Sequence, residues 1–161
     1  MSALPSPLGG PFDLERFLPF RLSVLGNRVT RAVARANGPR FHMSAPEWRS
    51  LAVLGRYGAM SAQEVGERTA MDKVRVSRAV TRLAGRRLVT RRTDPKDRRR
   101  AILDLSAEGR EIYQQIVPLA LAVEAELVAD LSATERAALD AAIRKLEARA
   151  RHQHGDEEIE T

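Results

Sequence analysis

The apolar residues of the chain recur at the three- and four-residue spacings that place side chains on one side of an α-helix. The clearest run precedes Ser44, where successive apolar positions are four, three, four and four residues apart. It consists of Leu18, Leu22, Leu25, Val29 and Val33. This pattern predicts a long helix that begins near Pro19, after a separate turn over residues 13–18, and ends at Gly38-Pro39.

Four serines indicate further helix starts. Ser44, Ser61 and Ser132 are each followed three residues later by glutamate. In such a capping box the serine hydroxyl accepts a hydrogen bond from the third helical amide, and the glutamate reaches back to the serine backbone. Ser106, with Glu108 in the first turn, is a weaker version of the same signal. The sequence therefore predicts a helix just after each of these serines.

The C-terminal part of the chain is predicted to be helical. After Ser106 the helical spacing continues to about Asp130, and Pro118 is expected to kink this helix or divide it in two. A last helix is predicted from about Ala133 to Arg151.

The segment after Ser61 has the pattern of a helix–turn–helix. Asp72 can cap a second helix, and only Thr69–Met71 separates it from the first. At about 100° per residue, the apolar side of the second helix is formed by Val76, Ala79, Val80 and Leu83. The opposite side carries Arg75, Arg78 and Arg82, with Val74 and Thr81 between them and Lys73 and Ser77 toward the edge. The sequence predicts a helix with an apolar back and a cationic front.

A β-hairpin is predicted directly after this helix. Leu88–Arg92 is rich in residues that favour strands, and residues 93–97 form a turn in which Pro95 fixes its own φ. The returning strand is predicted over Arg99–Leu105, with alternating apolar residues on one face. A hairpin that follows the second helix of a helix–turn–helix is a wing, and its tip contains Arg98 and Arg99.

Charge is concentrated in the same segment. The net charge is +6, but residues 71–100 hold 12 basic and 3 acidic residues, whereas residues 101–161 hold 6 basic and 13 acidic ones. Such segregation is typical of a nucleic-acid-binding face, although charge alone is equally compatible with a solvated surface. On the helix front, arginine can pair with guanine, Ser77 can contact a base or a phosphate, and Val74 can meet a thymine methyl group.

Composition excludes several other classes of protein. Aromatic residues make up only 4% of the chain, which favours closely packed helices over aromatic-rich sheets, and the absence of cysteine rules out disulfides and thiol chemistry. There is no run of 18 apolar residues, and the N-terminus lacks the features of a signal peptide, so we expect a cytoplasmic protein with no membrane partner. No catalytic motif and no cofactor-binding motif is present, which argues against an enzyme.

The combination of motifs resembles the MarR family of bacterial regulators. The stretch AMDKVRVSRAVTRLAGRRLVTRRTDPKDRRRAILDLSAEGR carries the helix, the wing and the L-S-x-x-G start of the next helix in the family's order. The capped helices SAPEWRSLAVL and SAQEVGERT also match, so the similarity covers about Leu14 to Ala150. It implies a mainly α fold with a small β-hairpin wing, a winged helix–turn–helix DNA-binding lobe and long N- and C-terminal dimerisation helices.

This resemblance divides the chain into five predicted regions. Residues 1–12 are a disordered arm, 13–43 an N-terminal dimerisation helix region, 44–105 the DNA-binding lobe, 106–151 the C-terminal dimerisation helices, and 152–161 a disordered tail. A homodimer would present two recognition helices about one DNA turn apart and would bind an inverted repeat in double-stranded DNA.

The predicted DNA-binding residues come from the recognition helix, its neighbour and the wing. The resemblance places the acid that orients a neighbouring basic side chain at Asp97 and the arginine that enters the minor groove at Arg99. The full set is Ser61, Lys73, Val74, Arg75, Ser77, Arg78, Arg82, Lys96, Asp97, Arg98 and Arg99. The predicted function is a sequence-specific regulator, most often a repressor in this family; the alternative is a non-specific architectural nucleic-acid-binding protein, for which neutralisation of phosphates by the same arginines would suffice.

Members of the family typically release DNA when a small molecule binds, often an aromatic acid or a related coenzyme A thioester. The candidate ligand-binding residues are Arg21, His42, Trp48 and Arg49, because a cation beside the single tryptophan could hold a carboxylate while the ring stacks on the ligand. For each residue alone, a core anchor or a surface arginine is the more frequent role. His42, His152 and His154 are too few and too badly spaced to predict a metal site.

Overall fold

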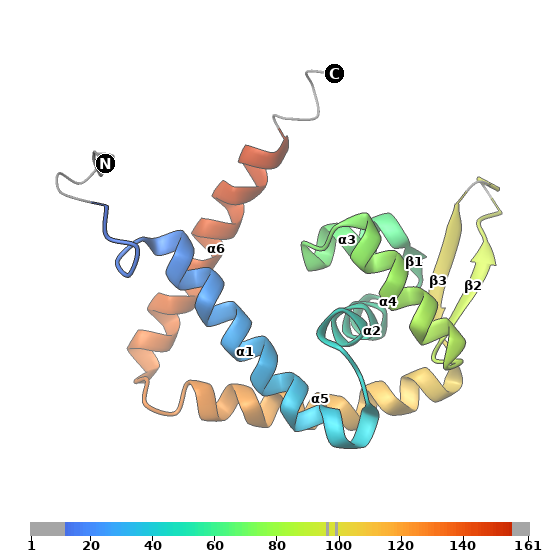
Figure 1. Cartoon of the computed structure of the whole chain (residues 1–161), viewed down its shortest axis with the longest axis horizontal. Helices are drawn as coiled ribbons and strands as arrows, with labels where there is room; N and C mark the ends of the chain where they lie inside the picture. Colours follow the sequence, from blue (N-terminus) through green and yellow to red (C-terminus); the bar gives the residue numbers. More distant parts are fainter. Residues whose placement is uncertain (1–11, 96, 99, 156–161) are drawn as a thin grey trace. The chain divides into compact units, whose positions relative to one another are not determined.

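The computed structural model describes residues 12–95, 97–98 and 100–155, apart from the side chains of residues 37–40 and 151–155. Six helices and three short strands follow one another in this part of the chain (Figure 1). They are α1 (Leu18–Phe41), α2 (Ala45–Tyr57), β1 (Met60–Ser61), α3 (Ala62–Thr69), α4 (Lys73–Gly85), β2 (Val89–Thr93), β3 (Ala101–Leu105), α5 (Ala107–Leu127) and α6 (Ala133–Gly155). The predicted mainly α fold with a small wing is confirmed.

The chain forms two compact units, Met1–Val123 and Glu124–Thr161. The first unit extends beyond the predicted lobe of residues 44–105, because Phe41 at the end of α1 and Ile116 of α5 are buried in the same core. The functional division into a DNA-binding lobe and dimerisation helices stays a prediction. Residues 1–11 and 156–161 of the predicted arm and tail lie outside the described residues.

Capping side chains start the helices where the sequence predicts them. In the capping boxes of Ser61 and Ser132, the serine amide donates to the glutamate carboxylate at 2.8 Å and the glutamate amide donates back to the serine Oγ at 3.3 Å. The amide of Ser44 donates to the Glu47 carboxylate at 2.7 Å. Each contact satisfies a backbone group that would otherwise lack a partner at the helix end.

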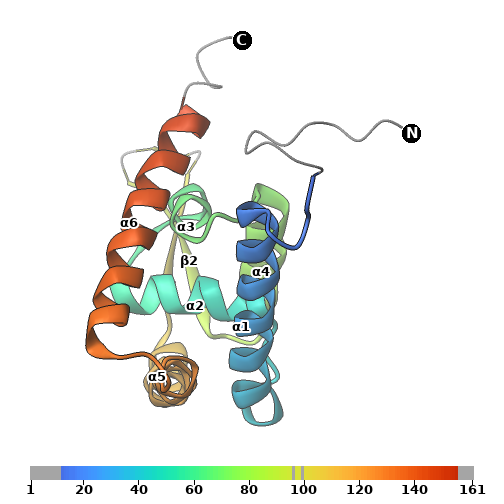
Figure 2. The same ribbon diagram turned by 90° about the vertical axis from the view of Figure 1, so that its left-hand side faces the viewer.

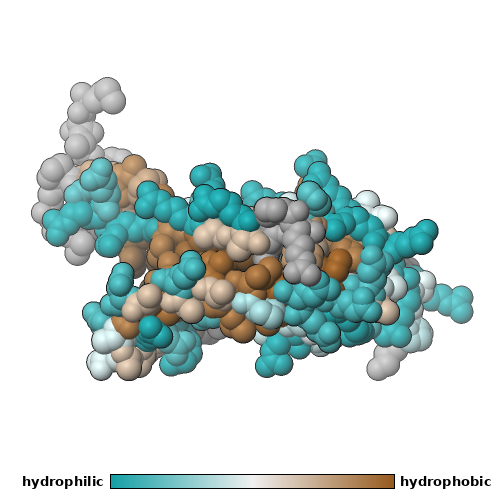
Figure 3. All heavy atoms as spheres, turned by 90° about the horizontal axis from the view of Figure 1, so that it is seen from below, coloured by the Kyte–Doolittle hydropathy of each residue, from teal (hydrophilic) through white to brown (hydrophobic). Residues whose placement is uncertain are grey.

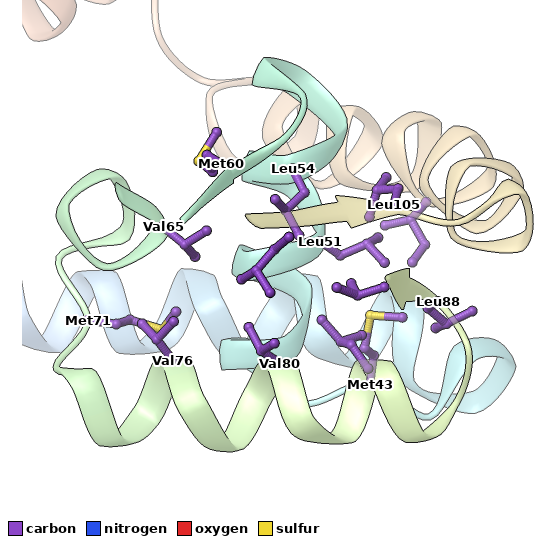
Figure 4. Close-up of a cluster of buried hydrophobic side chains, with 14 of the residues drawn as sticks. Met43, Leu51, Leu54, Met60, Val65, Met71, Val76, Val80, Leu88 and Leu105 are labelled. Atoms are coloured by element: carbon purple, nitrogen blue, oxygen red, sulfur yellow. The ribbon is translucent and has the colours of Figure 1, made fainter. Parts of the chain in front are cut away.

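The core of the first unit is built around α2. Leu51 and Leu54 of α2 are completely buried, and Figure 4 shows Val76 and Val80 of α4 directed toward α2. The four apolar positions predicted for the inner side of α4, which are Val76, Ala79, Val80 and Leu83, are all at most 3% exposed. The predicted orientation of this helix is therefore confirmed.

Helix α5 lies beneath α2 in both Figure 1 and Figure 2. The two helices pack closely, since a Cβ atom built on Gly55 would lie 2.6 Å from the ring of Tyr113. Glycine at this position allows the aromatic ring to lie directly against the α2 backbone.

The sheet is antiparallel, with strand order β1-β3-β2. Strands β2 and β3 form the predicted wing, in register from Val89 opposite Leu105 to Thr93 opposite Ala101. The described returning strand begins at Ala101 rather than at Arg99. The third strand, β1, was not predicted, because two residues are too few to show alternation; it forms where Met60 and Ser61 pair with Leu103 and Ile102.

The predicted end of α1 is wrong, and of the kink or division predicted at Pro118 the division is excluded. Helix α1 does not end at Gly38-Pro39 but continues to Phe41, whose burial in the core and whose carbonyl contact with Arg86 at 2.7 Å favour the longer helix. Helix α5 is not divided by Pro118. Pro118 and Gln114 are both exposed, so water can satisfy the carbonyl that loses its helical donor.

The end of α6 also differs from the prediction, because the helix continues to Gly155 rather than ending near Arg151. Among the described residues, no helix is both long enough and apolar enough to cross a membrane.

The start of α5 depends on Gly109. The Ser106 hydroxyl accepts a hydrogen bond from the Gly109 amide at 2.9 Å, and the Ser106 amide donates to the Leu88 carbonyl at 3.0 Å. A Cβ atom on residue 109 would lie only 2.0 Å from that carbonyl oxygen. Only glycine allows the helix to start so close to the wing.

We expect Gly109→Ala to lower the free energy of unfolding by about 3 kcal/mol, since the backbone around Leu88 must move to admit the methyl group. Urea denaturation at a fixed protein concentration measures this change. Gly85→Ala is the matched control, because a Cβ atom there would meet nothing within 4 Å; it should be neutral or slightly stabilising. Equal stability of the two variants would contradict the role assigned to Gly109.

Candidate DNA-binding surface

The outer side of α4 is exposed and cationic. Lys73, Arg75, Ser77, Arg78 and Arg82 are all exposed, and Val74 is 57% exposed although it is apolar. The residues that the sequence assigned to the front of this helix therefore lie together on the side opposite the core. This surface offers donors for bases and phosphates, together with one apolar contact.

The arginines of this surface differ in their surroundings. The Arg75 amide donates to Asp72 Oδ1 at 2.8 Å, and Arg75 Nε lies 3.2 Å from Asp72 Oδ2. Within the part of the chain that the structure describes, Arg78 and Arg82 form no ion pair or side-chain hydrogen bond. Asp72 thus caps the helix, as predicted, and also orients the first of its exposed arginines.

Ser61 does not lie on this surface as a free hydroxyl. It is only 5% exposed, and its Oγ both donates to the Glu64 carboxylate at 2.7 Å and accepts from Arg100 Nη2 at 3.2 Å. The structure uses Ser61 as a cap and as an anchor for the wing, so we leave it out of the proposed DNA contacts.

The wing carries exposed residues at its tip and along one strand. Asp97 and Arg98 are exposed, and the Asp97 carbonyl accepts from the Arg100 amide at 2.9 Å. Lys96 and Arg99, which were also predicted to contact DNA, lie outside the described residues. Arg91 and Arg92 of β2 are exposed as well. Both were predicted to lie in a strand, and no role was predicted for them.

Two arginines of the basic segment serve the fold. Arg100 bonds to Ser61 and lies 3.7 Å from Glu64, so it ties the wing to the start of α3. Arg86 donates through Nη2 to the Phe41 carbonyl and through Nη1 to the His42 carbonyl, at 2.7 and 3.1 Å, and so joins the end of α4 to the end of α1. Partners 36 to 45 residues away could not be identified from the charge pattern.

The predicted ligand-binding residues do not form one cluster. Trp48 is half-buried against the core, and Arg49 donates to the Thr30 hydroxyl of α1 at 3.1 Å. His42 is exposed with φ of 47°. Arg21 is exposed on α1, nine residues before Thr30, which is about 13 Å along a helix. Among the described residues, no group of three or more histidine, aspartate or glutamate side chains could hold a metal ion.

The comparison with protein families matches residues 43–100, which span α2, the helix–turn–helix and the wing, to the MarR family. Over this span the chain is similar to the MarR family, whose members are transcriptional regulators, the class of protein that the sequence predicts.

Individual relatives show the same similarity. The transcriptional repressor NicR of Pseudomonas putida is 30% identical over 104 residues, which span 65% of this chain and 66% of NicR, slightly less than two thirds of its length. BpsR of Bordetella bronchiseptica, whose DNA binding is regulated by 6-hydroxynicotinic acid, is 26% identical, with a TM-score of 0.77 over 86% of this chain and 98% of BpsR. A MarR/EmrR family regulator of Acinetobacter shares the fold, with a TM-score of 0.80 at 23% identity over 88% and 99% of the two chains.

The contact of Arg100 with Ser61 and Glu64, which ties the wing to α3, depends on the charge of the Glu64 carboxylate. Hydrogen bonds from the Ser61 hydroxyl and amide hold the pKa of Glu64 below its ordinary value, and the nearby guanidinium groups of Arg100 and Arg68 lower it further. A carboxyl group with a lowered pKa stabilises the fold above its ordinary pKa, and this contribution is lost as the pH falls through the lowered value.

We expect Glu64→Gln to lower the free energy of unfolding by about 1 kcal/mol at neutral pH, because glutamine keeps the cap geometry but not the charge-assisted bonds. The gap between variant and parent should close as the pH falls below the lowered pKa of Glu64, where the parent loses the same charge. Denaturation curves at several pH values measure this gap. Glu67→Gln is the control, because it removes an equal charge beside Gln63 without touching the cap, and its difference in unfolding free energy should not show this dependence on pH. A difference for Glu64→Gln that stays constant with pH would contradict the role given to the Glu64 charge.

Proposed function

We propose that the chain is a sequence-specific repressor that binds a near-palindromic operator in double-stranded DNA as a homodimer and responds to a small ligand. The observation that carries this proposal is the outer side of α4, where exposed arginines surround an exposed valine and a serine beside a cationic wing. A helix of this shape and chemistry fits the major groove, and an arginine at the wing tip suits the narrow minor groove. The proposed contacts are those predicted from the sequence without Ser61.

We propose that a second copy of the chain covers the large apolar residues that α1, α5 and α6 leave exposed. Figure 3 views the molecule from the side on which α5 lies in Figure 1 and shows apolar residues gathered in a band between hydrophilic ones. Exposed large apolar residues occur in α1, α5 and α6, among them Leu18, Leu22, Leu25, Leu121, Leu139, Ile143 and Leu146. Each of the two units thus leaves large apolar side chains exposed on its own helices. Exposed apolar side chains favour burial against a partner, and a two-fold partner would supply the second recognition helix.

Repression follows from occupancy, because a dimer that covers a promoter excludes polymerase without a further interaction surface. The repressor NicR is a relative that points the same way. The competing function, a non-specific architectural protein, would need only phosphate contacts and would show no preference among sequences.

Selection of bound duplexes from a random-sequence pool at physiological salt tests this function. We expect enrichment of an inverted repeat whose half-sites are about one helical turn apart. Retention of DNA without enrichment of any sequence would contradict the proposal and favour the architectural protein.

Arg78→Ala then provides the control on the selected site. Loss of the Arg78 side chain should weaken binding to the selected site by about 1–3 kcal/mol if that side chain contacts a base in bidentate fashion. Binding to random duplex should weaken far less. Fluorescence anisotropy with both duplexes measures the two effects. Equal weakening on the two duplexes would indicate phosphate contacts alone.

The proposed ligand is a small anionic aromatic acid or its coenzyme A thioester. BpsR supports this chemical class, because 6-hydroxynicotinic acid regulates its DNA binding. Of the four residues predicted to contact the ligand, Trp48 and Arg49 carry the proposal because they are neighbours in α2. Arg21 and His42 lie at opposite ends of α1, so both cannot contact the same small ligand. The bond from Arg49 to Thr30 links α2 to α1 at this place, so a ligand that recruits the Arg49 guanidinium would disturb that link.

We expect 6-hydroxynicotinic acid, benzoic acid or one of their thioesters to quench the fluorescence of Trp48 and to weaken binding to the selected operator. Because Trp48 is the only tryptophan, its emission reports on this place directly. Arg49→Ala should reduce the quenching, since the carboxylate loses its cation. A flat fluorescence titration across the panel, with operator affinity unchanged, would contradict the proposal.

A further inference from the structure

The first turn of the recognition helix α4 carries a carboxylate where DNA binding alone would not favour one. Asp72 is the N-cap of α4, and 59% of its side chain is exposed. A negative charge at a surface that approaches phosphates opposes association. Capping requires only an oxygen acceptor, and serine or asparagine would supply one without a charge. The helix dipole favours a negative charge at this end. Unlike serine or asparagine, aspartate also leaves a second anionic oxygen free to pair with a guanidinium.

The two carboxylate oxygens of Asp72 contact two different groups of Arg75, its backbone amide and its side chain. Oδ1 accepts from the Arg75 backbone amide at 2.8 Å, and Oδ2 faces Arg75 Nε at 3.2 Å. The backbone and the guanidinium of Arg75 are thus held by the same group. A guanidinium has five N–H donors, and one of them is directed to Asp72, which leaves the four on the terminal nitrogens for a ligand.

The ion pair contributes little to folding. The Arg75 side chain is 71% exposed and that of Asp72 is 59% exposed, and an ion pair so accessible to water is a weak source of stability. Its strength would increase where a bound duplex excludes water, because the local dielectric falls. The pair therefore adds little to the stability of the free protein, although it is formed there, and it would be stronger in a complex.

We propose that Asp72 is a positioning residue that holds Arg75 for bidentate recognition of one guanine in each half-site; this inference rests on the function proposed above. Bidentate contact with guanine O6 and N7 needs two terminal N–H groups in one plane, and fixing Nε orients that plane. Fixing it before binding also reduces the side-chain entropy lost in the complex. Arg78 and Arg82, which have no such partner among the described residues, must be ordered by the DNA itself.

The operator obtained by selection provides the test. Binding of the protein to operator duplexes with each of the four bases at each half-site position gives the preference for guanine, position by position. Asp72→Asn keeps an oxygen for the cap and removes the charge. We expect the preference for guanine to fall about tenfold at one position per half-site and to stay unchanged at the others. Affinity for random duplex should rise or stay the same, because a negative charge has been removed.

A double-mutant cycle with Arg75→Ala shows whether Asp72 acts through Arg75. Arg75→Ala should abolish the same preference, and adding Asp72→Asn to it should change nothing further. An unchanged guanine preference in Asp72→Asn would overturn the inference. So would a further loss when Asp72→Asn is added to Arg75→Ala, because Asp72 would then contact a base by itself.

Two controls separate this inference from other effects. Glu67→Gln removes an equal charge from α3 and should leave the guanine preference intact. Thermal unfolding of Asp72→Asn should stay close to that of the parent, and the base preference is a ratio that a general loss of stability would not move. If the parent protein selects no inverted repeat, the proposed function fails; if it does and Asp72→Asn keeps its guanine preference, only the role of Asp72 fails.

Discussion

The burial of one side of α4 against α2 is the interaction on which the rest of the first unit depends. Val76, Val80 and Leu83 are at most 1% exposed, and burying side chains of this size contributes about 1.5–3 kcal/mol each. Together these contributions are comparable to the whole net stability of a typical domain, about 5–15 kcal/mol. Rotation of α4 about its axis would forfeit them. The direction of its arginines is consequently fixed by residues on the other side of the helix.

Signals contained in a few neighbouring residues predicted the structure best. The capping pairs of Ser61 and Ser132 and the cap at Asp72 act over three residues, so the sequence shows both partners at once. The same holds for the inner side of α4, where the helical period alone separates buried from exposed positions. The wing was predictable as well, because its strands are close in sequence and alternate in polarity.

Features that depend on distant partners could not be predicted. Strand β1 exists only because β3 offers it a pairing edge, and α1 passes Gly38-Pro39 because Phe41 is buried in a core assembled from later residues. Ser61 was predicted to contact DNA, but Arg100 and Glu64 both engage its hydroxyl. The basic segment likewise looked uniform, although Arg86 and Arg100 hold the fold together.

The contact of Arg86 has a mechanical consequence. A guanidinium that bonds two successive carbonyls resists both sliding and turning of the segment it holds, and here that segment is the end of α1. The backbone of Arg86 forms the C-cap of α4. The C-terminal ends of α1 and α4 are therefore held together by one residue and are expected to move together. We therefore expect a displacement of α1 at this end to move the C-terminal end of α4 with it.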